Sequence, residues 1–526
     1  MGMIKKYFKK GNIFTFIFLI VAFHPLLELD YLLDGLLPIP RLTTVINFIV
    51  LPLLVLLVFF AYEKNKKRIA TMFGIYAAVF AVYYVIHCYS ANNIQYTIYL
   101  TKNFYFSLYD ETAYTLTLLL PLVYVYVFYL SDINERILKK ICITLSATTS
   151  LPIFISNLFV FGMSTYAGYT KDSFLSWFSL PFDAKECHPR YYATKFFFEE
   201  GNTIGILMLM VLPFLYYFLY KEKDRKRKAV LTALIVIHSL SMIILSTRLA
   251  TYTSAIIPAA MFIIYMVLLF LKKETLQKSY IITLVAVILM TSVIIPYSPA
   301  YQNQLIDATN YQFIKEDDRI KEEARTNLKE GEKNPKWSEE WRNFYTYMFE
   351  AYVSLINVTP PVYYTYYYDY KYDPEFWVRF IFDYELEERV NGRQLEAIFT
   401  RYKWNELSSA QKLTGLGYGT FMRGGIIIER DFVRQYYSYG PIGAILIMGG
   451  WIVLLAYTGI KLLLGYKRNK WTYLNISLFM SVCMGYLSSY VSGHTLDELT
   501  TSMFISLCLA YLIKELKKDE DKELAE

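Results

Sequence analysis

The chain has 526 residues, of which 55% are hydrophobic, 18% aromatic and only 19% charged. These fractions exclude an ordinary soluble protein and indicate one that crosses a membrane many times. The formal net charge of +7 does not indicate nucleic-acid binding, because the basic residues gather in short clusters between apolar segments. Of the five cysteines, only Cys187 falls in a segment expected outside the membrane, so no disulfide framework is expected there.

Apolar segments recur along the chain, each near the length of about 20 residues that a helix needs to cross a bilayer. The first follows a basic amino terminus and has no small-residue cleavage site after it, so we expect it to be retained as a span. The expected spans cover residues 12–27, 43–62, 69–88, 112–130, 141–162, 200–219, 229–247, 250–271, 279–297, 438–464, 471–490 and 499–513. The sequence therefore predicts an all-α integral membrane protein with about twelve transmembrane helices.

Lysine and arginine clusters occupy alternate connections between these spans. They lie at residues 5–10, 64–68, 136–140, 221–228, 272–278 and 467–470 and in the tail from 514. The positive-inside rule places all of them, and hence both termini, in the cytoplasm of a bacterium with this protein in its plasma membrane. The other side then receives residues 28–42, 89–111, 163–199, 246–248, 298–437 and 492–495.

This orientation divides the chain into four parts. Residues 1–297 form a membrane domain with spans one to nine, and 438–513 form spans ten to twelve. Between them, 298–437 is one large, mainly helical extracytoplasmic loop that we expect to carry part of the active site. Residues 514–526 are a charged cytoplasmic tail.

Tyrosines crowd the middle of the large loop, within residues 359–372. Flat rings that carry a hydroxyl suit stacking on sugars, and they suit the membrane interface equally well. The sequence leaves both interpretations open, glycan and lipid.

The end of the loop carries glycines and then charges. Gly415, Gly417 and Gly419 favour a tight turn over a helix. Glu429 and Asp431 follow, close to the tenth span, where a carboxylate with a raised pKa could act as a general base. The alternative is an ordinary salt bridge from Glu429 to Arg430 or Arg434.

Two arginines on the expected outer side are candidate anion ligands. Arg248 stands beside Ser246 and Thr247 between two apolar runs, where a guanidinium can grip two pyrophosphate oxygens or can reach to lipid headgroups. Arg393 lies in the large loop, where a solvated charge is the alternative. The five histidines are scattered, with His494 in an outer turn, and no His-x-x-x-His or Cys-x-x-Cys pair predicts a metal site.

Several motifs occur in an order that resembles the O-antigen ligase and O-antigen polymerase superfamily. They are Leu-Ser-Thr-Arg at 245–248, Gly-Leu-Gly-Tyr-Gly at 415–419, Glu-x-Asp-Phe at 429–432 and Ser-Tyr-Gly-Pro-Ile-Gly at 438–443, together with an entry to a span that contains Asn202. The large loop near the carboxyl end is a further similarity. These features touch roughly the last two thirds of the chain.

The resemblance implies a glycosyltransferase that needs no cofactor. Its donor would be a glycan on undecaprenyl pyrophosphate, and its acceptor a hydroxyl of another glycan, a lipid or a wall polymer, with inversion at the anomeric carbon. It implies that Arg248 and Arg393 hold the pyrophosphate and that Glu429, with Asp431, is the catalytic base. Further candidates for substrate binding are Asn202, Arg434, Tyr439 and His494. The partners implied are the lipid bilayer and other polysaccharide export proteins.

One position departs from the ligases of that superfamily. Their histidine is replaced here by Glu429. This favours a polymerase, or a Gram-positive relative that acts on a wall polymer. Two other classes of protein remain as alternatives: a flippase or other transporter, which would require charged residues inside the spans, and a cell-surface scaffold that binds sugar without turnover.

Overall fold

The computed structural model describes residues 10–33, 41–97, 104–166, 193–313, 318–331, 333–353, 361–389, 391–426, 428–468 and 470–518. Within these residues, twelve helices are long and apolar enough to cross a membrane. Strands β1 (Ser164–Thr165) and β2 (Thr194–Phe196) form one small antiparallel sheet. The prediction of an all-α multi-pass membrane protein is therefore confirmed. Cys187, residues 359–360 of the tyrosine-rich segment and most of the charged tail lie outside the described residues.

The helices that contain the spans follow the predicted order along the chain. They are α2 (Lys10–Phe23) with η1 (His24–Leu33), α3 (Leu42–Val45) with η2 (Ile46–Val50) and α4 (Leu51–Tyr62), α5 (Lys66–Thr97), α6 (Leu108–Leu130), α7 (Glu135–Leu158), α8 (Gly201–Lys221), α9 (Arg225–Ile244), α10 (Arg248–Phe270), α11 (Lys278–Ile294), α20 (Asp431–Leu464), α21 (Tyr473–Val491) and α22 (Leu499–Lys517). Two ends differ most from the expected ones: α5 continues nine residues beyond the expected end at 88, and α20 begins seven residues before the expected start at 438. The first turn of α20 is polar, so hydropathy did not mark it.

The chain forms two compact units. Unit 1 comprises Met1–Thr71, Thr117–Leu305 and Gly450–Glu526. Unit 2 comprises Met72–Leu116 and Ile306–Gly449.

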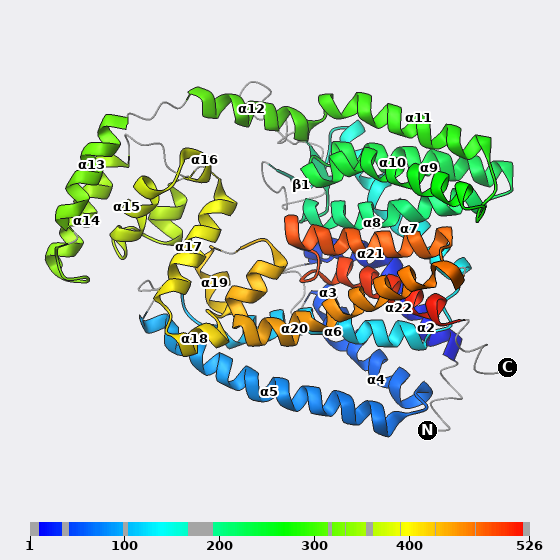
Figure 1. The fold of residues 1–526 in the computed structure, drawn as a ribbon, viewed down its shortest axis with the longest axis horizontal. Coiled ribbons are helices and arrows are strands. Elements are labelled where there is room, and N and C mark those ends of the chain that lie inside the picture. The colour runs from blue at the N-terminus through cyan, green and yellow to red at the C-terminus, as the bar shows by residue number, and fades with distance from the viewer. Residues whose placement is uncertain are drawn as a thin grey trace. The chain divides into compact units, whose positions relative to one another are not determined.

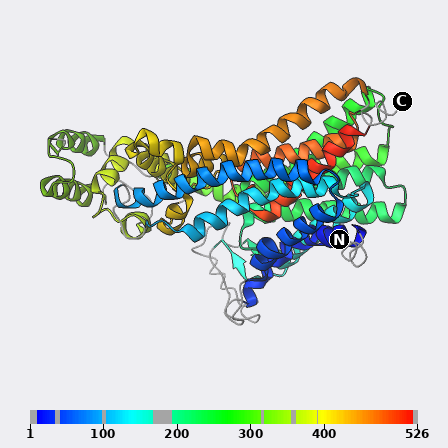
Figure 2. The same ribbon diagram turned by 90° about the horizontal axis from the view of Figure 1, so that it is seen from below.

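Helix α8 is the central element of unit 1. It packs against α7, α9, α10, α21 and α22 (Figures 1 and 2). Almost all of its side chains are buried. Glycines permit close approach at two of these contacts. A Cβ atom on Gly205 of α8 would lie 3.0 Å from the Thr247 hydroxyl, and one on Gly485 of α21 would lie 2.9 Å from the Met210 sulfur. Small residues at helix contacts are a common solution in membranes, where packing must replace the hydrophobic effect.

Unit 2 contains the helices between the ninth and tenth spans. They are α13 (Asp318–Gly331), α14 (Glu339–Tyr352), the π-helix η6 (Tyr363–Tyr367), α15 (Pro374–Asp383), α16 (Leu386–Arg389), α17 (Gly392–Glu406), α18 (Ser409–Thr414) and α19 (Tyr418–Gly424). Their core is aromatic, with Trp341, Tyr345, Phe349, Phe376, Trp377 and Phe399 all buried. The large segment is thus mainly helical, as predicted.

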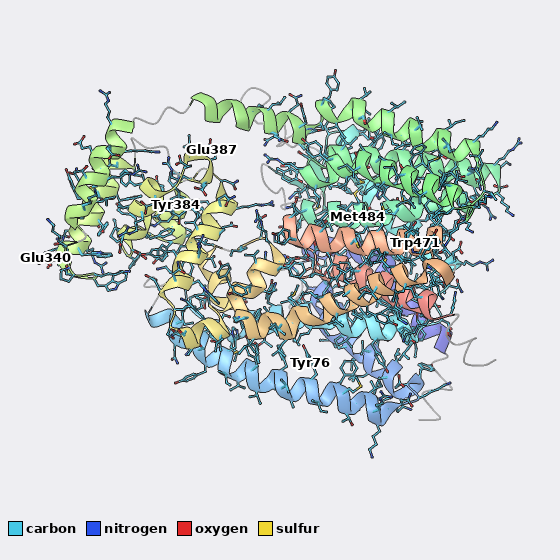
Figure 3. All side chains as sticks on the ribbon, viewed as in Figure 1. Tyr76, Glu340, Tyr384, Glu387, Trp471 and Met484 are labelled. Atoms are coloured by element: carbon cyan, nitrogen blue, oxygen red, sulfur yellow. The ribbon has the colours of Figure 1, made fainter. Side chains whose placement is uncertain are left out.

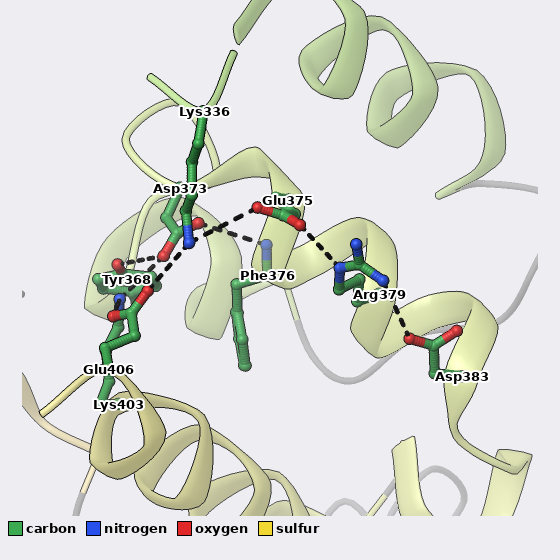
Figure 4. Close-up of polar contacts among 9 residues, drawn as sticks. All are labelled: Lys336, Tyr368, Asp373, Glu375, Phe376, Arg379, Asp383, Lys403 and Glu406. Carbon is green, nitrogen blue, oxygen red and sulfur yellow. Dashed lines mark hydrogen bonds and ion pairs between the residues drawn. The ribbon is translucent and has the colours of Figure 1, made fainter. Parts of the chain in front are cut away.

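A buried ion pair crosses this aromatic core. Lys403 of α17 and Asp373, which caps α15, are both fully buried, with the Lys403 ammonium 2.9 Å from the Asp373 carboxylate (Figure 4). Asp373 also accepts hydrogen bonds from the Tyr368 hydroxyl at 2.8 Å and from the Phe376 N–H at 3.3 Å. Glu406 lies 3.3 Å from the same ammonium. Because every charge has a partner, the pair ties α15 to α17 without leaving an unmatched ion in the core.

Lys403→Ala should therefore destabilise unit 2 strongly. It would leave the Asp373 carboxylate buried without its cation, which costs about 3–5 kcal/mol. We expect faster limited proteolysis of the 318–426 region and a lower melting temperature in detergent. Lys371→Ala is the control, because the Lys371 side chain is exposed; equal effects of the two substitutions would contradict the role given to the buried pair.

Candidate active site

A contact between two glycine-containing segments fixes the end of unit 2. Gly415 and Gly417 have φ angles of +89° and +83°, which L side chains rarely adopt, so the tight turn predicted here is present at these two residues. For Gly419 the prediction was wrong, because this residue lies in the helix α19. The Leu416 and Gly417 N–H groups donate to the carbonyl oxygens of Tyr437 and Ser438, both at 2.9 Å. A Cβ atom on Gly415 would overlap the Ser438 carbonyl. The turn is thus held directly against α20.

The same turn is supported from the other side by a histidine and a glutamate. His87 of α5 and Glu111 of α6 are fully buried, and the His87 Nε2 atom lies 2.9 Å from the Glu111 carboxylate. The His87 Nδ1 atom lies 2.7 Å from the Thr414 carbonyl, and Glu111 accepts a hydrogen bond from the Gly419 N–H at 2.6 Å. This pair was not predicted from the sequence, although a carboxylate at the start of an apolar span was a signal for it.

Between the turn and α20, Glu429 forms an ion pair with Arg393. Arg393 lies in the first turn of α17, where Asn391 caps the helix by accepting a hydrogen bond from the Arg393 N–H at 3.1 Å. The side chains of Arg393 and Glu429 are 43% and 31% exposed, so solvent and ligands can reach both. Two residues that were separate candidates in the sequence therefore form one site.

The salt bridge that the sequence left as the alternative for Glu429, to Arg430 or Arg434, is not the one in the structure, where Arg393 is the partner. The Arg434 guanidinium turns back along the chain. It donates to the carbonyl oxygens of Ile428 and Glu429 and to the Tyr114 hydroxyl at 3.2 Å. Arg434 is only 4% exposed. Its N–H groups bind backbone carbonyl oxygens that lie just before α20 and have no partner within that helix. The Glu429 carboxylate pairs with Arg393 instead.

A second carboxyl group, Glu396, accompanies this pair. It lies three residues after Arg393 on α17, so the two side chains share a face of the helix. Its Oε2 atom is buried, with no hydrogen-bond partner among the described residues. Burial, followed by the nearby charge of Glu429, raises the pKa of Glu396 from 4.5 to about 8, against smaller opposing effects of Arg393 and Arg434. At neutral pH this carboxyl mostly carries a proton, beside a glutamate that is ion-paired.

Asp431 and Tyr439, two further candidates, are buried in α20. Asp431 stands in the first turn, where a negative charge favours the helix dipole. The Tyr439 hydroxyl lies 2.8 Å from the Thr115 hydroxyl, and its carbonyl accepts a hydrogen bond from Tyr83. The side chains of both residues are fully buried.

Three candidates belong to unit 1. Arg248 is the exposed first residue of α10, directly after Thr247, whose hydroxyl caps the helix by accepting a hydrogen bond from the Ala250 N–H at 3.4 Å. Asn202 is half-buried in the first turn of α8. Because Gly205 of α8 packs on Thr247, these two helix starts lie at the same end of unit 1.

The third, His494, lies in the turn between α21 and α22. Its Nδ1 atom is 3.9 Å from the Asp497 carboxylate. Asp497 lines a cavity of about 330 Å³ within unit 1. The other polar residues that line it include His24, Glu28, Asp30, Arg41, Thr43, Thr44, Asn47, Thr117, Glu199, Glu200, Thr203, Glu498 and Thr500. This acidic cavity was not predicted from the sequence.

Within the part of the chain that the structure describes, no group of three or more histidine, cysteine or acidic side chains is arranged to hold a metal ion. The contact of Arg393 with Glu429 offers the chemistry of a guanidinium and a carboxyl group. An exposed arginine can hold an anion, and a carboxylate beside it can accept a proton.

Comparison with known proteins agrees with this description. A family model described as "O-antigen ligase like membrane protein" matches residues 9–519. A search of curated proteins found no match.

The raised pKa of Glu396 predicts a specific dependence of stability on pH. The folded protein keeps this proton between pH 4.5 and about 8, whereas the unfolded chain releases it, so the contribution of Glu396 to stability is full below 4.5 and is lost as pH rises to about 8. Glu396→Gln cannot ionise. The melting temperature of the variant minus that of the wild type should therefore increase from pH 5 to pH 8 and then level off.

The control for this measurement is Glu387→Gln, because Glu387 is exposed (labelled in Figure 3). A difference for Glu396→Gln that is constant over the whole pH range would show that its carboxyl does not titrate in this window.

Proposed function

Because the chain belongs to the O-antigen ligase-like membrane proteins, multi-pass membrane enzymes of surface polysaccharide synthesis, we propose that it transfers lipid-linked oligosaccharide at the outer face of the membrane. The donor is an oligosaccharide on undecaprenyl pyrophosphate, and the acceptor is a hydroxyl group of a second glycan. The replacement of the ligase histidine by Glu429 favours polymerisation of repeat units over transfer to a different acceptor.

The observation that carries this proposal is the half-exposed pair of Arg393 and Glu429 close to Glu396, whose pKa is raised by burial. Glycosyl transfer from a lipid pyrophosphate needs a cation for the leaving group and a base for the acceptor proton. The pair contains both. Two carboxyl groups with different surroundings also let one remain neutral while the other accepts a proton.

The reaction proceeds by displacement at the anomeric carbon of the donor. Glu429 takes the proton of the acceptor hydroxyl, and the acceptor oxygen forms a bond to the anomeric carbon from the face opposite the leaving group. The bond from that carbon to the pyrophosphate oxygen breaks, and its electron pair leaves with undecaprenyl pyrophosphate. The configuration inverts, and no oxidant, reductant or nucleotide is needed.

Binding of the donor prepares the base. Without substrate, the Arg393 guanidinium is occupied by Glu429. A pyrophosphate that binds Arg393 competes for the same donors, because a guanidinium pairs with carboxylate and phosphate in the same bidentate geometry. The Glu429 carboxylate is thereby released to accept a proton only when a donor is present.

Arg248 is also proposed to bind pyrophosphate, a role carried over from its motif at 245–248. It is exposed at the start of a helix, where the helix dipole also favours an anion. Asn202, whose helix packs on the turn before Arg248, is proposed to contact the donor near it.

The direct test supplies the purified protein with undecaprenyl-pyrophosphate-linked repeat units from its own host, without nucleotide. Release of lipid pyrophosphate together with a ladder of longer glycans would support a polymerase. A single transfer to an added wall or lipid acceptor would support a ligase. Folded protein that releases no lipid pyrophosphate under either condition would contradict the proposal and favour a transporter or a scaffold.

Glu429→Gln should lower the rate of transfer by at least about 100-fold, because it removes the base and keeps the shape of the side chain. Release of undecaprenyl pyrophosphate is the readout, and binding of the lipid-linked donor should be retained. Glu387→Gln is again the control. A variant with normal turnover would remove Glu429 from the mechanism.

Arg248→Ala should lower kcat/KM for the lipid-linked donor by about 10 to 100-fold, the effect of losing a charged hydrogen-bonding partner. Arg248→Lys should restore it only in part, because an ammonium cannot pair bidentately. Lys278→Ala is the matched control, since Lys278 is likewise the exposed first residue of a helix, α11. If both alanine variants polymerise normally, Arg248 is a boundary residue that contacts lipid headgroups.

A further inference from the structure

The tyrosine-rich segment forms a π-helix in unit 2, with aromatic rings on both sides of its backbone. The Tyr363 and Tyr367 rings are half-buried and pack on the aromatic core. The two rings meet edge to face, with centroids 5.4 Å apart, and Tyr367 meets Tyr366 in the same way at 5.5 Å. Tyr366 is 67% exposed. The rings of Tyr363, Tyr366 and Tyr367, called the ledge below, are thus supported by the core, and Tyr366 faces solvent. Helices of the π type are frequent at functional sites.

This ledge adjoins the candidate active site. The Tyr363 hydroxyl lies 3.1 Å from the point where a Cβ atom on Gly392 would stand, and Gly392 directly precedes Arg393. The Tyr367 ring fills the space in front of Gly425, a few residues before Glu429. Burial, and then the charges of Glu396, Tyr367 and Glu429, raise the pKa of Tyr363 to about 12, so its hydroxyl keeps its proton and can donate a hydrogen bond.

We propose that Tyr363 and Tyr366 form a stacking platform for a pyranose ring of the acceptor glycan, which presents its hydroxyl to Glu429. This inference rests on the proposed function for the identity of its ligand. The C–H face of a sugar packs on an aromatic ring, and the phenol hydroxyls can bond to the hydroxyls at its edge. The acceptor, rather than the pyrophosphate, belongs here, because the platform provides neutral rings and the cation lies beyond it at Arg393.

The surroundings favour a glycan over a lipid chain. Asp369 and Lys371 follow the ledge directly, and the Tyr370 hydroxyl donates to Glu350 at 2.8 Å. Arg342 donates to the Lys371 carbonyl at 3.1 Å, and both side chains are exposed. A hydrocarbon chain would remove water from these polar groups without replacing its hydrogen bonds, whereas a sugar can replace them. Binding of a glycan at this segment therefore costs less desolvation free energy than contact with a lipid chain.

The test compares two tyrosines of almost equal exposure. Tyr366 is 67% exposed and Tyr347, on α14, is 69% exposed, so neither substitution by alanine should disturb folding. Binding to the intact protein in nanodiscs is measured by saturation-transfer NMR with two separate probes. One is the lipid-free repeat-unit oligosaccharide of the host, and the other is undecaprenyl pyrophosphate without sugar.

We expect Tyr366→Ala to weaken binding of the oligosaccharide by about fivefold, the effect of one lost aromatic contact. Binding of sugar-free undecaprenyl pyrophosphate should not change. Tyr366→Trp should restore oligosaccharide binding, and Tyr347→Ala should leave both probes unaffected. In turnover, Tyr366→Ala should raise the KM for acceptor and change kcat little.

The possible failures are distinguishable. If Tyr366→Ala weakens binding of the lipid instead, the segment is a membrane contact and the inference is wrong. If transfer occurs in the wild type and Tyr366→Ala behaves like Tyr347→Ala, the platform is wrong while the proposed function stands. If the wild type binds the oligosaccharide through Tyr366 but transfers nothing, the sugar site stands and the proposed function fails.

Discussion

The arrangement of unit 2 depends on a contact between backbones. Gly415 faces the Ser438 carbonyl and the Gly440 N–H, and Gly440 in turn faces the carbonyls of Lys412 and Leu413. A Cβ atom at either glycine would overlap backbone atoms of the other segment. Because the contact joins the end of α18 to the first turns of α20, it also fixes the ends of the segment that carries Glu429. The ion pair with Arg393 then orients the carboxylate within that segment.

Buried polar groups connect the helices of unit 2. Removing such groups from water costs free energy, and this cost is offset only when each group has a hydrogen-bonding or charged partner. His87 and Glu111 meet this condition by contacting the glycine turn as well as each other. Lys403 and Asp373 meet it inside the aromatic core. Glu396 does not meet it, since one of its carboxyl oxygens is buried without a partner, and it keeps a proton instead. This carboxyl lies close to the exposed ion pair of Arg393 and Glu429, where a titrating group can be useful.

The fold could be predicted largely from local composition. Each span is a long apolar run, and the bilayer leaves a helix as the only way for such a run to satisfy its own backbone. The turn at Gly415 and Gly417 was equally local, because glycine is the residue that adopts these angles readily. The start of α20 at Asp431 was missed, since its first turn is polar and lies outside the apolar run.

The site was less predictable, because its contacts join distant residues. Arg393 and Glu429 were both candidates, yet nothing local indicates that they pair with each other, and Arg434 was the nearer cation along the chain. The spacing of Arg393 and Glu396 on one helix was readable, but the pKa of Glu396 depends on burial that only the folded structure defines. His87 and Glu111 likewise meet only after two helices pack.

The kink in α20 restricts the substitutions that this segment can accept during evolution. Gly440 leaves the helical conformation with a φ angle of +65° while the helix continues on both sides of it. A side chain at position 415 or 440 would meet backbone atoms of the other segment, so a change at one position cannot make room for a side chain at the other. The turn, the kinked helix and the carboxylate between them therefore depend on both glycines. Exchange of segments between related proteins could vary the tyrosine-rich segment or the aromatic core, but it would have to keep glycine at both positions.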